Sequence, residues 1–138
     1  MATKTGKSRR SGVLAKMAGV TAGLALLTVG TVTQAQASPS AGYIGDGYAN
    51  NTHGVWCVQH LLNDIAVDFG YNRPLAEDGI WGPNTRAWVE WYQRSVLFLD
   101  HVTVDGIVGK ETGGNLLLGG DQYYGGTNYC YSYVPSKF

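Results

Sequence analysis

Residues 75–85 read LAEDGIWGPNT, and residues 102–112 read VTVDGIVGKET, so that the same pattern recurs 27 positions later. Asp, Gly, Ile, Gly and Thr are identical at matching positions of the two copies. Each copy combines an apolar residue, an Asp-Gly pair, an apolar pair and a Gly that precedes the expected start of a helix. The internal repeat therefore predicts two equivalent turns, each of which leads into a helix.

Each residue type in the repeat suits a tight turn. The aspartate can accept hydrogen bonds from backbone N–H groups of its own turn, and the glycine after it permits a positive φ. We expect Ile80 and Ile107 to point into the core, the second glycine to allow a close approach of the chain, and the threonine hydroxyl to serve free backbone donors of the first helical turn. The predicted structural turn residues are Asp78, Gly79, Gly82 and Thr85 in the first copy and Asp105, Gly106, Gly109 and Thr112 in the second. The spacing does not match a calcium loop.

Hydrophobic periodicity predicts three helices, over residues 55–69, 83–96 and 110–118. Asn51 or Thr52 can cap the first helix. The apolar stripes of the first two helices comprise Val55, Val58, Leu61, Leu62, Ile65 and Phe69, and Trp88, Trp91, Tyr92 and Val96. We therefore expect an all-α fold, a small three-helix bundle built from two turn–helix units.

Residues 1–37 are predicted to be a secretory signal peptide. A basic start from Lys4 to Arg10 precedes an apolar run over residues 13–32, and Ala35-Gln36-Ala37 supplies the small-x-small pattern that signal peptidases accept. A membrane anchor is the alternative, because the apolar run approaches spanning length. The prediction is a secreted protein, extracellular or associated with the cell wall, with no membrane contact after cleavage.

Two cysteines, Cys57 and Cys130, follow the signal segment. An even count in an exported chain predicts one disulfide, which would stabilise the fold by about 4 kcal/mol because it closes a long loop. The alternative is a Cys57 nucleophile with His60 or His101 as its base. Exported thiols usually oxidise, and this favours the disulfide.

The remaining segments flank the helices. Residues 38–53 are predicted to be an extended N-terminal segment, residues 54–118 the folded domain, and residues 119–138 a Tyr/Gly-rich tail. Alternation over residues 129–133 allows a short strand. The tail tyrosines, among them Tyr123 and Tyr124, either pack over the core beside the disulfide or stack on sugar rings.

These elements resemble the bacterial peptidoglycan-binding module that has a repeated Asp-Gly-x-x-Gly-x-x-Thr turn. Its pattern is Val-x-x-x-Gln-x-x-Leu, a first turn, a helix ending in aromatic-Gln, a second turn and a terminal Leu. Here residues 55–62 read VWCVQHLL, Tyr92-Gln93 ends the second helix, and Leu116 follows the second turn. The resemblance covers about residues 54–118.

The resemblance implies a small helical fold that binds cell-wall peptidoglycan and usually targets an attached hydrolase to it. One departure lies at Gly113, because the family often has Trp directly after the second Thr. We expect no second folded unit in the mature chain, so that a partner hydrolase would be a separate protein.

Two polar and aromatic groups are the candidate ligand contacts. A glycan or peptide ligand needs a shallow groove with aromatic faces and a few polar groups. Trp81 stands where the second copy has Val108, and Arg86 could bind a stem-peptide carboxylate. The candidate contacts are Trp81, Asn84 and Arg86 in one group and Tyr71, Asn72 and Arg73 in the other.

No catalytic motif is present in residues 38–138. The serines lie in no Gly-x-Ser-x-Gly, and His53, His60 and His101 have no zinc-peptidase spacing, so we expect surface or capping roles for the histidines. Glu77 and Glu90 are the carboxylates that a glycosidase could use. We expect a non-catalytic protein without metal or cofactor. The alternatives are a secreted wall hydrolase, cysteine- or carboxylate-based, and an interaction or inhibitor subunit for a separate hydrolase.

Composition limits the partners. The chain has 138 residues, 44% apolar and 14% charged, which is typical of one globular domain. Residues 38–138 hold five basic and ten acidic residues, a net charge of −5. Because phosphate recognition needs a basic surface, we expect no nucleic-acid partner. The expected partner is peptidoglycan, bound by a monomer.

Overall fold

The structure is a computed structural model that describes residues 40–119 and 129–137. The predicted signal peptide and the tail residues Tyr123 and Tyr124 lie outside the described residues. The described part of the chain is helical, with no strand beyond a single antiparallel bridge between Ile44 and Val108. None of its helices is long and apolar enough to cross a bilayer.

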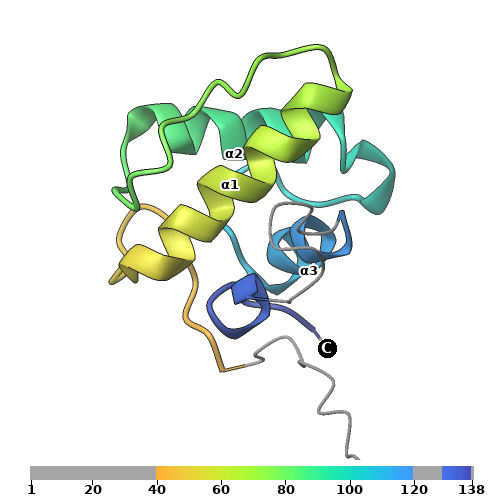
Figure 1. Cartoon of the computed structure of the whole chain (residues 1–138). Coiled ribbons are helices and arrows are strands. Elements are labelled where there is room, and N and C mark those ends of the chain that lie inside the picture. Colours follow the sequence, from red (N-terminus) through yellow and green to blue (C-terminus); the bar gives the residue numbers. More distant parts are fainter. Residues whose placement is uncertain (1–39, 120–128, 138) are drawn as a thin grey trace, which may run out of the picture. The chain divides into compact units, whose positions relative to one another are not determined.

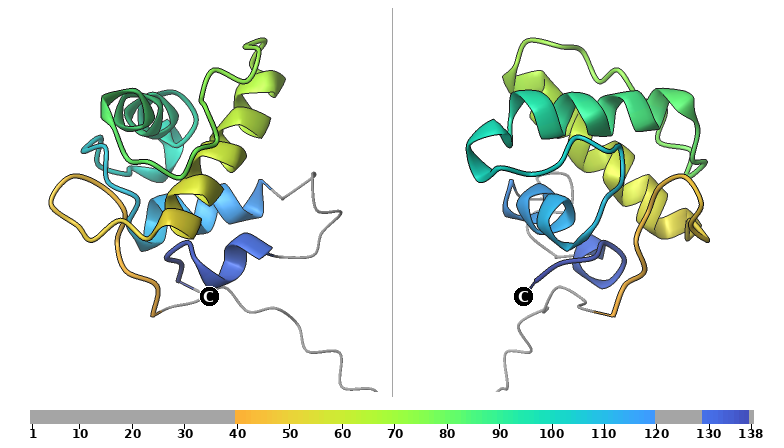
Figure 2. Two further views of the ribbon diagram at one scale, coloured as in Figure 1. Left: turned by 60° about the vertical axis from the view of Figure 1, so that its left-hand side comes forward. Right: turned by 180° about the vertical axis from the view of Figure 1, so that it is seen from behind.

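Three α-helices and two short 3-10 helices follow one another along the chain. They are α1 (Thr52–Asp68), α2 (Pro83–Ser95), η1 (Phe98–Asp100), α3 (Lys110–Leu118) and η2 (Tyr129–Ser132). Figure 1 shows α1 running diagonally in front of α2. Helices α3 and η2 lie below and to the right of α1 in this view. The view from behind shows the segment after η1 running between α2 and α3 (Figure 2).

Helix α1 begins three residues earlier than its hydrophobic pattern predicted, because Asn51 caps it. The Asn51 Oδ1 atom accepts hydrogen bonds from the backbone N–H groups of His53, at 2.9 Å, and Gly54, at 3.2 Å. These bonds satisfy donors that a helix start otherwise leaves free. The helix ends before Phe69, which is 53% exposed and so does not belong to the buried stripe in which it was placed.

The core lies between the three α-helices. Its fully buried side chains include Val55, Val58, Leu61, Leu62, Val89, Tyr92, Val108, Leu116 and Leu117. The apolar periodicity of α1 therefore identified its buried face. In α2 the pattern was less informative, because Val89 and Tyr92 are buried while Trp88 and Trp91 are only partly so.

The predicted disulfide between Cys57 and Cys130 is present. It joins α1 to η2, with a Cα–Cα distance of 5.5 Å, and both cysteines are fully buried. The strand allowed by the sequence over residues 129–133 is instead a 3-10 helix, because its backbone bonds are local: the N–H groups of Tyr133 and Val134 both donate to the Cys130 carbonyl. Tyr129, Tyr131 and Tyr133 pack partly buried against the core.

A buried glutamine on α1 holds the first turn. Gln59 Nε2 lies 2.9 Å from Asp78 Oδ1, 3.1 Å from the Ile80 carbonyl and 3.2 Å from Thr85 Oγ1. Its Oε1 accepts the Gly79 N–H at 2.9 Å. The amide side chain thus replaces water for four groups of the turn.

Gln93 on α2 makes a corresponding set of contacts to the second turn. Its Nε2 lies 3.0 Å from Asp105 Oδ1, 3.0 Å from the Ile107 carbonyl and 3.2 Å from Thr112 Oγ1. Its Oε1 accepts the Gly106 N–H at 2.9 Å. Both turn threonines therefore face a glutamine, and not the free backbone donors that the sequence suggested.

The turn backbones also have like geometry. Asp78 accepts the N–H of Ile80, and Asp105 accepts that of Ile107, each at 2.9 Å. Gly79 and Gly106 have φ values of 69° and 70°, which only glycine adopts without strain. Three details of the prediction were wrong. Ile80 is 68% exposed and Ile107 only partly buried, whereas Val108, the next residue of the second turn, is fully buried. A side chain at Gly82 would also meet no atom within 4 Å, so that glycine marks no close approach.

Candidate functional site

An open groove of about 780 Å³ lies beside the start of α3. We call it the α3 groove. It is lined by the N-terminal segment with Tyr43 and Tyr48, by residues 100–103, by the second turn and by the first turns of α3. We call the part formed by Tyr43 and Tyr48 the tyrosine wall. Hollows with aromatic faces and polar groups are the usual form of ligand sites.

The tyrosine wall presents two exposed rings. Tyr43 and Tyr48 are 42% and 43% exposed, and their ring centroids lie 5.6 Å apart at a tilt of 49°. Between them the backbone of Ile44 pairs with that of Val108 through two hydrogen bonds, at 2.8 and 3.2 Å. The wall is therefore fixed to the second turn by buried backbone pairing.

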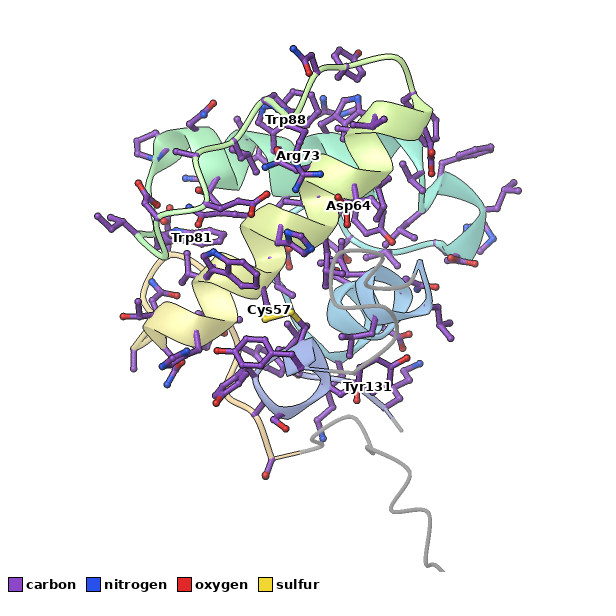
Figure 3. The ribbon with its side chains drawn as sticks, in the orientation of Figure 1. Cys57, Asp64, Arg73, Trp81, Trp88 and Tyr131 are labelled. Carbon is purple, nitrogen blue, oxygen red and sulfur yellow. A yellow bond between two sulfur atoms is a disulfide. The ribbon has the colours of Figure 1, made fainter. Side chains whose placement is uncertain are left out.

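Two of the predicted ligand residues bind Asp46, which lies between Tyr43 and Tyr48 in the sequence. Trp81 Nε1 donates to Asp46 Oδ1 at 2.8 Å, and Arg86 Nη1 donates to Asp46 Oδ2 at 2.8 Å. Arg86 Nε also donates to Glu90 at 3.0 Å. Figure 3 shows Trp81 away from Arg73 and Trp88, toward the segment that precedes α1. The side chains of Trp81 and Arg86 thus position the segment that carries Tyr43 and Tyr48, and they do not line the groove.

Charges of both signs line the groove. Glu111 pairs with Lys137, and Asp105 is engaged in its turn. Lys110, the first residue of α3, and Asp100, the last residue of η1, are exposed and form no ion pair with another described residue. The pKa of the Tyr92 hydroxyl is raised, mainly because the side chain is buried. The negative charge of Asp100 is the second, smaller cause.

The second predicted ligand group is divided in the structure. Arg73 forms ion pairs with Asp64 and, at 2.5 Å, with Glu77. The hydrogen bond to Asp64 is the main cause that raises the pKa of the Arg73 guanidinium. Figure 3 shows Arg73, from the loop after α1, close to Asp64 on α1. Tyr71 turns away from this pair and packs edge-on against Trp88 and Trp91 at 5.1 and 5.5 Å.

His60 was expected at the surface but is 1% exposed. Its Nδ1 lies 3.1 Å from Glu77 Oε2 and its Nε2 lies 3.4 Å from Asp64 Oδ2, while its ring stacks on Trp56 at 4.9 Å. The hydrophobic periodicity of α1 did not predict that His60 is buried, because histidine is not an apolar residue. Polar side chains from the loop before α2 supply the partners that its buried ring needs. The imidazole, two carboxylates and Arg73 together tie that loop to α1.

Glu77 in this network has a perturbed carboxylate. Burial raises the pKa of Glu77, but hydrogen bonds from Asn63, Arg73 and His60 outweigh it and hold the pKa below its usual value. The pKa of Asp78 is also lowered, first by the Ile80 backbone N–H and then by Gln59. Such shifts mark carboxylates that are stabilised in the ionised form.

The other predicted contacts are exposed. Asn72 and Asn84 lie at the surface of the loop and of the first turn of α2, outside the α3 groove. The groove residues Tyr43, Tyr48 and Lys110 were not singled out in the sequence. Within residues 40–119 and 129–137, no three His, Cys, Asp or Glu side chains are grouped to hold a metal ion.

Comparison with protein-family models, with curated proteins and with solved structures finds no match to this chain. The resemblance to the peptidoglycan-binding module therefore depends on the motif residues alone.

Proposed function

We propose that the chain is a secreted, non-catalytic module that binds bacterial peptidoglycan. The observation that carries the proposal is the matched pair of glutamine-centred turns. Gln59 and Gln93 stand at the two Gln positions of the family pattern, and each contacts the Asp, Gly and Thr of the turn that follows it. These matched contacts support a pseudo-repeat of two turn–helix units within a small three-helix bundle.

The α3 groove supports a binding role for this fold. It is open, it has two exposed tyrosine rings, and its lining includes charged and hydroxyl-bearing side chains. Tyrosine offers both an apolar face and a hydroxyl to a ligand. We therefore place the peptidoglycan contact in this groove, with Trp81 and Arg86 as residues that position its wall through Asp46.

Two further observations agree with a secreted protein that does no chemistry. The Cys57–Cys130 disulfide is compatible with an oxidising compartment outside the cytoplasm, and it leaves Cys57 no thiolate with which to attack a substrate. Glu77 is engaged by Asn63 and Arg73, which favours a structural role for that carboxylate over a catalytic one.

Sedimentation with insoluble peptidoglycan tests the proposal. The oxidised protein should pellet with purified sacculi, and a Tyr43→Ala/Tyr48→Ala variant should pellet less. Tyr71→Ala, which removes an exposed ring outside the groove, is the matched control and should pellet as the unmodified protein does. A protein that stays in the supernatant contradicts peptidoglycan binding.

A dye-release assay on the same labelled material separates the remaining alternatives. We expect no release, and release above background would show a hydrolase. Co-purification with a wall hydrolase, without sedimentation on sacculi, would instead favour an interaction or inhibitor subunit.

A further inference from the structure

We infer that the α3 groove recognises the peptide stem of peptidoglycan and not its glycan strand, with Lys110 binding a stem carboxylate and Asp100 a stem amino group. The inference rests on the proposed function and names the part of the polymer that the groove selects.

The distribution of charge in the groove is its first support. Asp105 already accepts hydrogen bonds from Ile107 and Gln93, and Glu111 already pairs with Lys137. Lys110 and Asp100 remain, one cation and one anion, both exposed and both without an ion-pair partner in the part of the chain that the structure describes. Asp105 keeps its negative charge, because its partners are neutral amides, but its carboxylate is held in the turn. The groove therefore offers a ligand one cation, Lys110, and one carboxylate that is engaged in neither a turn nor an ion pair, Asp100.

Only the peptide part of peptidoglycan matches that pair of charges. The sugar rings carry hydroxyl and acetamido groups, which are neutral, whereas the stems carry carboxylates and, at an uncrosslinked diamino acid, an ammonium group. A lysine is a compact point charge that suits a carboxylate, and an aspartate accepts hydrogen bonds from an ammonium group.

The tyrosine wall is consistent with a peptide ligand. The ring planes of Tyr43 and Tyr48 are tilted by 49° to each other. The two rings therefore form no flat surface on which one sugar ring could stack against both tyrosines. Their rings can instead pack on the methyl groups of alanines in a stem. The Tyr43 ring lies beside Gly109: a Cβ atom on Gly109 would be 3.5 Å from the ring. A ligand that lies along the tyrosine wall therefore runs toward the next residue, Lys110.

Soluble probes test the inference with the oxidised full-length mature protein. Isothermal titration or NMR titration would compare the N-acetylated stem tripeptide L-Ala-γ-D-Glu-diaminopimelate with a neutral tetrasaccharide of β-1,4-linked N-acetylglucosamine. A stem-free muramyl strand is avoided because its lactyl carboxylates would be charged. We expect saturable binding of the tripeptide, and weakening by salt because both charges are exposed. Lys110→Gln and Asp100→Asn should each weaken it about fivefold to tenfold, as expected for the loss of one charged hydrogen bond.

Matched controls remove the same charges elsewhere. Arg94→Gln on α2 and Asp68→Asn on α1 replace exposed residues outside the groove and should leave tripeptide binding unchanged. The carboxylates of the tripeptide can also be converted to amides. This amidated tripeptide should bind the unmodified protein and Lys110→Gln equally weakly. Circular dichroism and urea denaturation of each variant show whether it is folded, which separates the loss of one contact from the loss of the fold.

The outcomes distinguish this inference from the proposed function. Binding to sacculi that the tripeptide competes and the tetrasaccharide does not would support the stem assignment. Binding to sacculi that only the tetrasaccharide competes would overturn it and leave peptidoglycan binding intact. Failure to bind sacculi and both probes would overturn the two together.

Discussion

The backbone carbonyl of Pro135 occupies the space that a side chain at Gly113 would need. A Cβ atom on Gly113 would lie 2.1 Å from the Pro135 oxygen and 2.9 Å from Val134 Cγ1. The resembling family often has Trp at this place. Here the segment that follows η2 packs on α3 instead, and the disulfide at Cys130 keeps that segment in place.

Gly113→Ala should therefore destabilise the protein, although alanine favours helices. We expect the free energy of unfolding to fall by about 1–3 kcal/mol, because the opposing atom is backbone and cannot rotate away. Urea denaturation measures the change. Gly42→Ala is the control, since a Cβ there meets nothing within 4 Å. Equal stability of Gly113→Ala and the unmodified protein would contradict the close contact.

Gln59→Met and Gln93→Met should each cost about 2–4 kcal/mol of stability, because a thioether leaves several buried groups of a turn without a hydrogen-bond partner. If the two turns are equivalent units, the two losses should agree within about 1 kcal/mol. Thermal or urea denaturation followed by circular dichroism gives both values. Asn84→Ala, an exposed amide at the start of α2, should change stability by less than about 0.5 kcal/mol. A large loss at one glutamine alone would argue against equivalence.

Removal of the disulfide should lower stability by about 4 kcal/mol, since the bonded cysteines are 73 residues apart in sequence. The change can be made by Cys57→Ala/Cys130→Ala and measured by urea denaturation. A reducing agent should shift the unmodified protein toward the stability of the double variant. The same agent should leave the double variant unaffected, and a shift in that variant would point to an effect unrelated to the bond.

Acid should weaken the network around Arg73. Because the folded-state pKa of Glu77 is lowered, its contribution to stability is present above its unfolded pKa of about 4.3 and is lost as the pH falls through the lower folded value. Glu77→Gln should therefore be less stable than the unmodified protein at pH 7, with a smaller difference at pH 3. Urea midpoints at both pH values test this. Asp68→Asn, outside the network, is the control, and a difference that grows in acid would reverse the expected sign.

Local sequence signals predicted much of the fold. Periodicity placed α2 and α3 to within one residue, the two cysteines predicted the disulfide, and Asn51 was one of two expected caps. These features depend on neighbouring residues, or on a pair that had no competing partner, and can therefore be recognised in a single sequence.

The site depends on contacts that local patterns do not encode. Arg86 reaches Asp46, 40 residues earlier, and this contact turns a predicted ligand residue into a support for the tyrosine wall. His60 is buried because carboxylates from two different segments surround it. The only sequence signal for the wall was the run YIGDGY over residues 43–48, in which an Asp between glycines is flanked by tyrosines.

The position of Cys130, after all three α-helices, has a consequence for how an exported chain matures. If the chain is exported as proposed, Cys57 reaches the oxidising compartment first, and its intramolecular disulfide can form only after residue 130 has followed. During that interval an oxidant can link it only to another molecule, so early oxidation would produce covalent dimers in place of the closed monomer. Any chain that terminates before residue 130 would keep this reactive sulfur permanently.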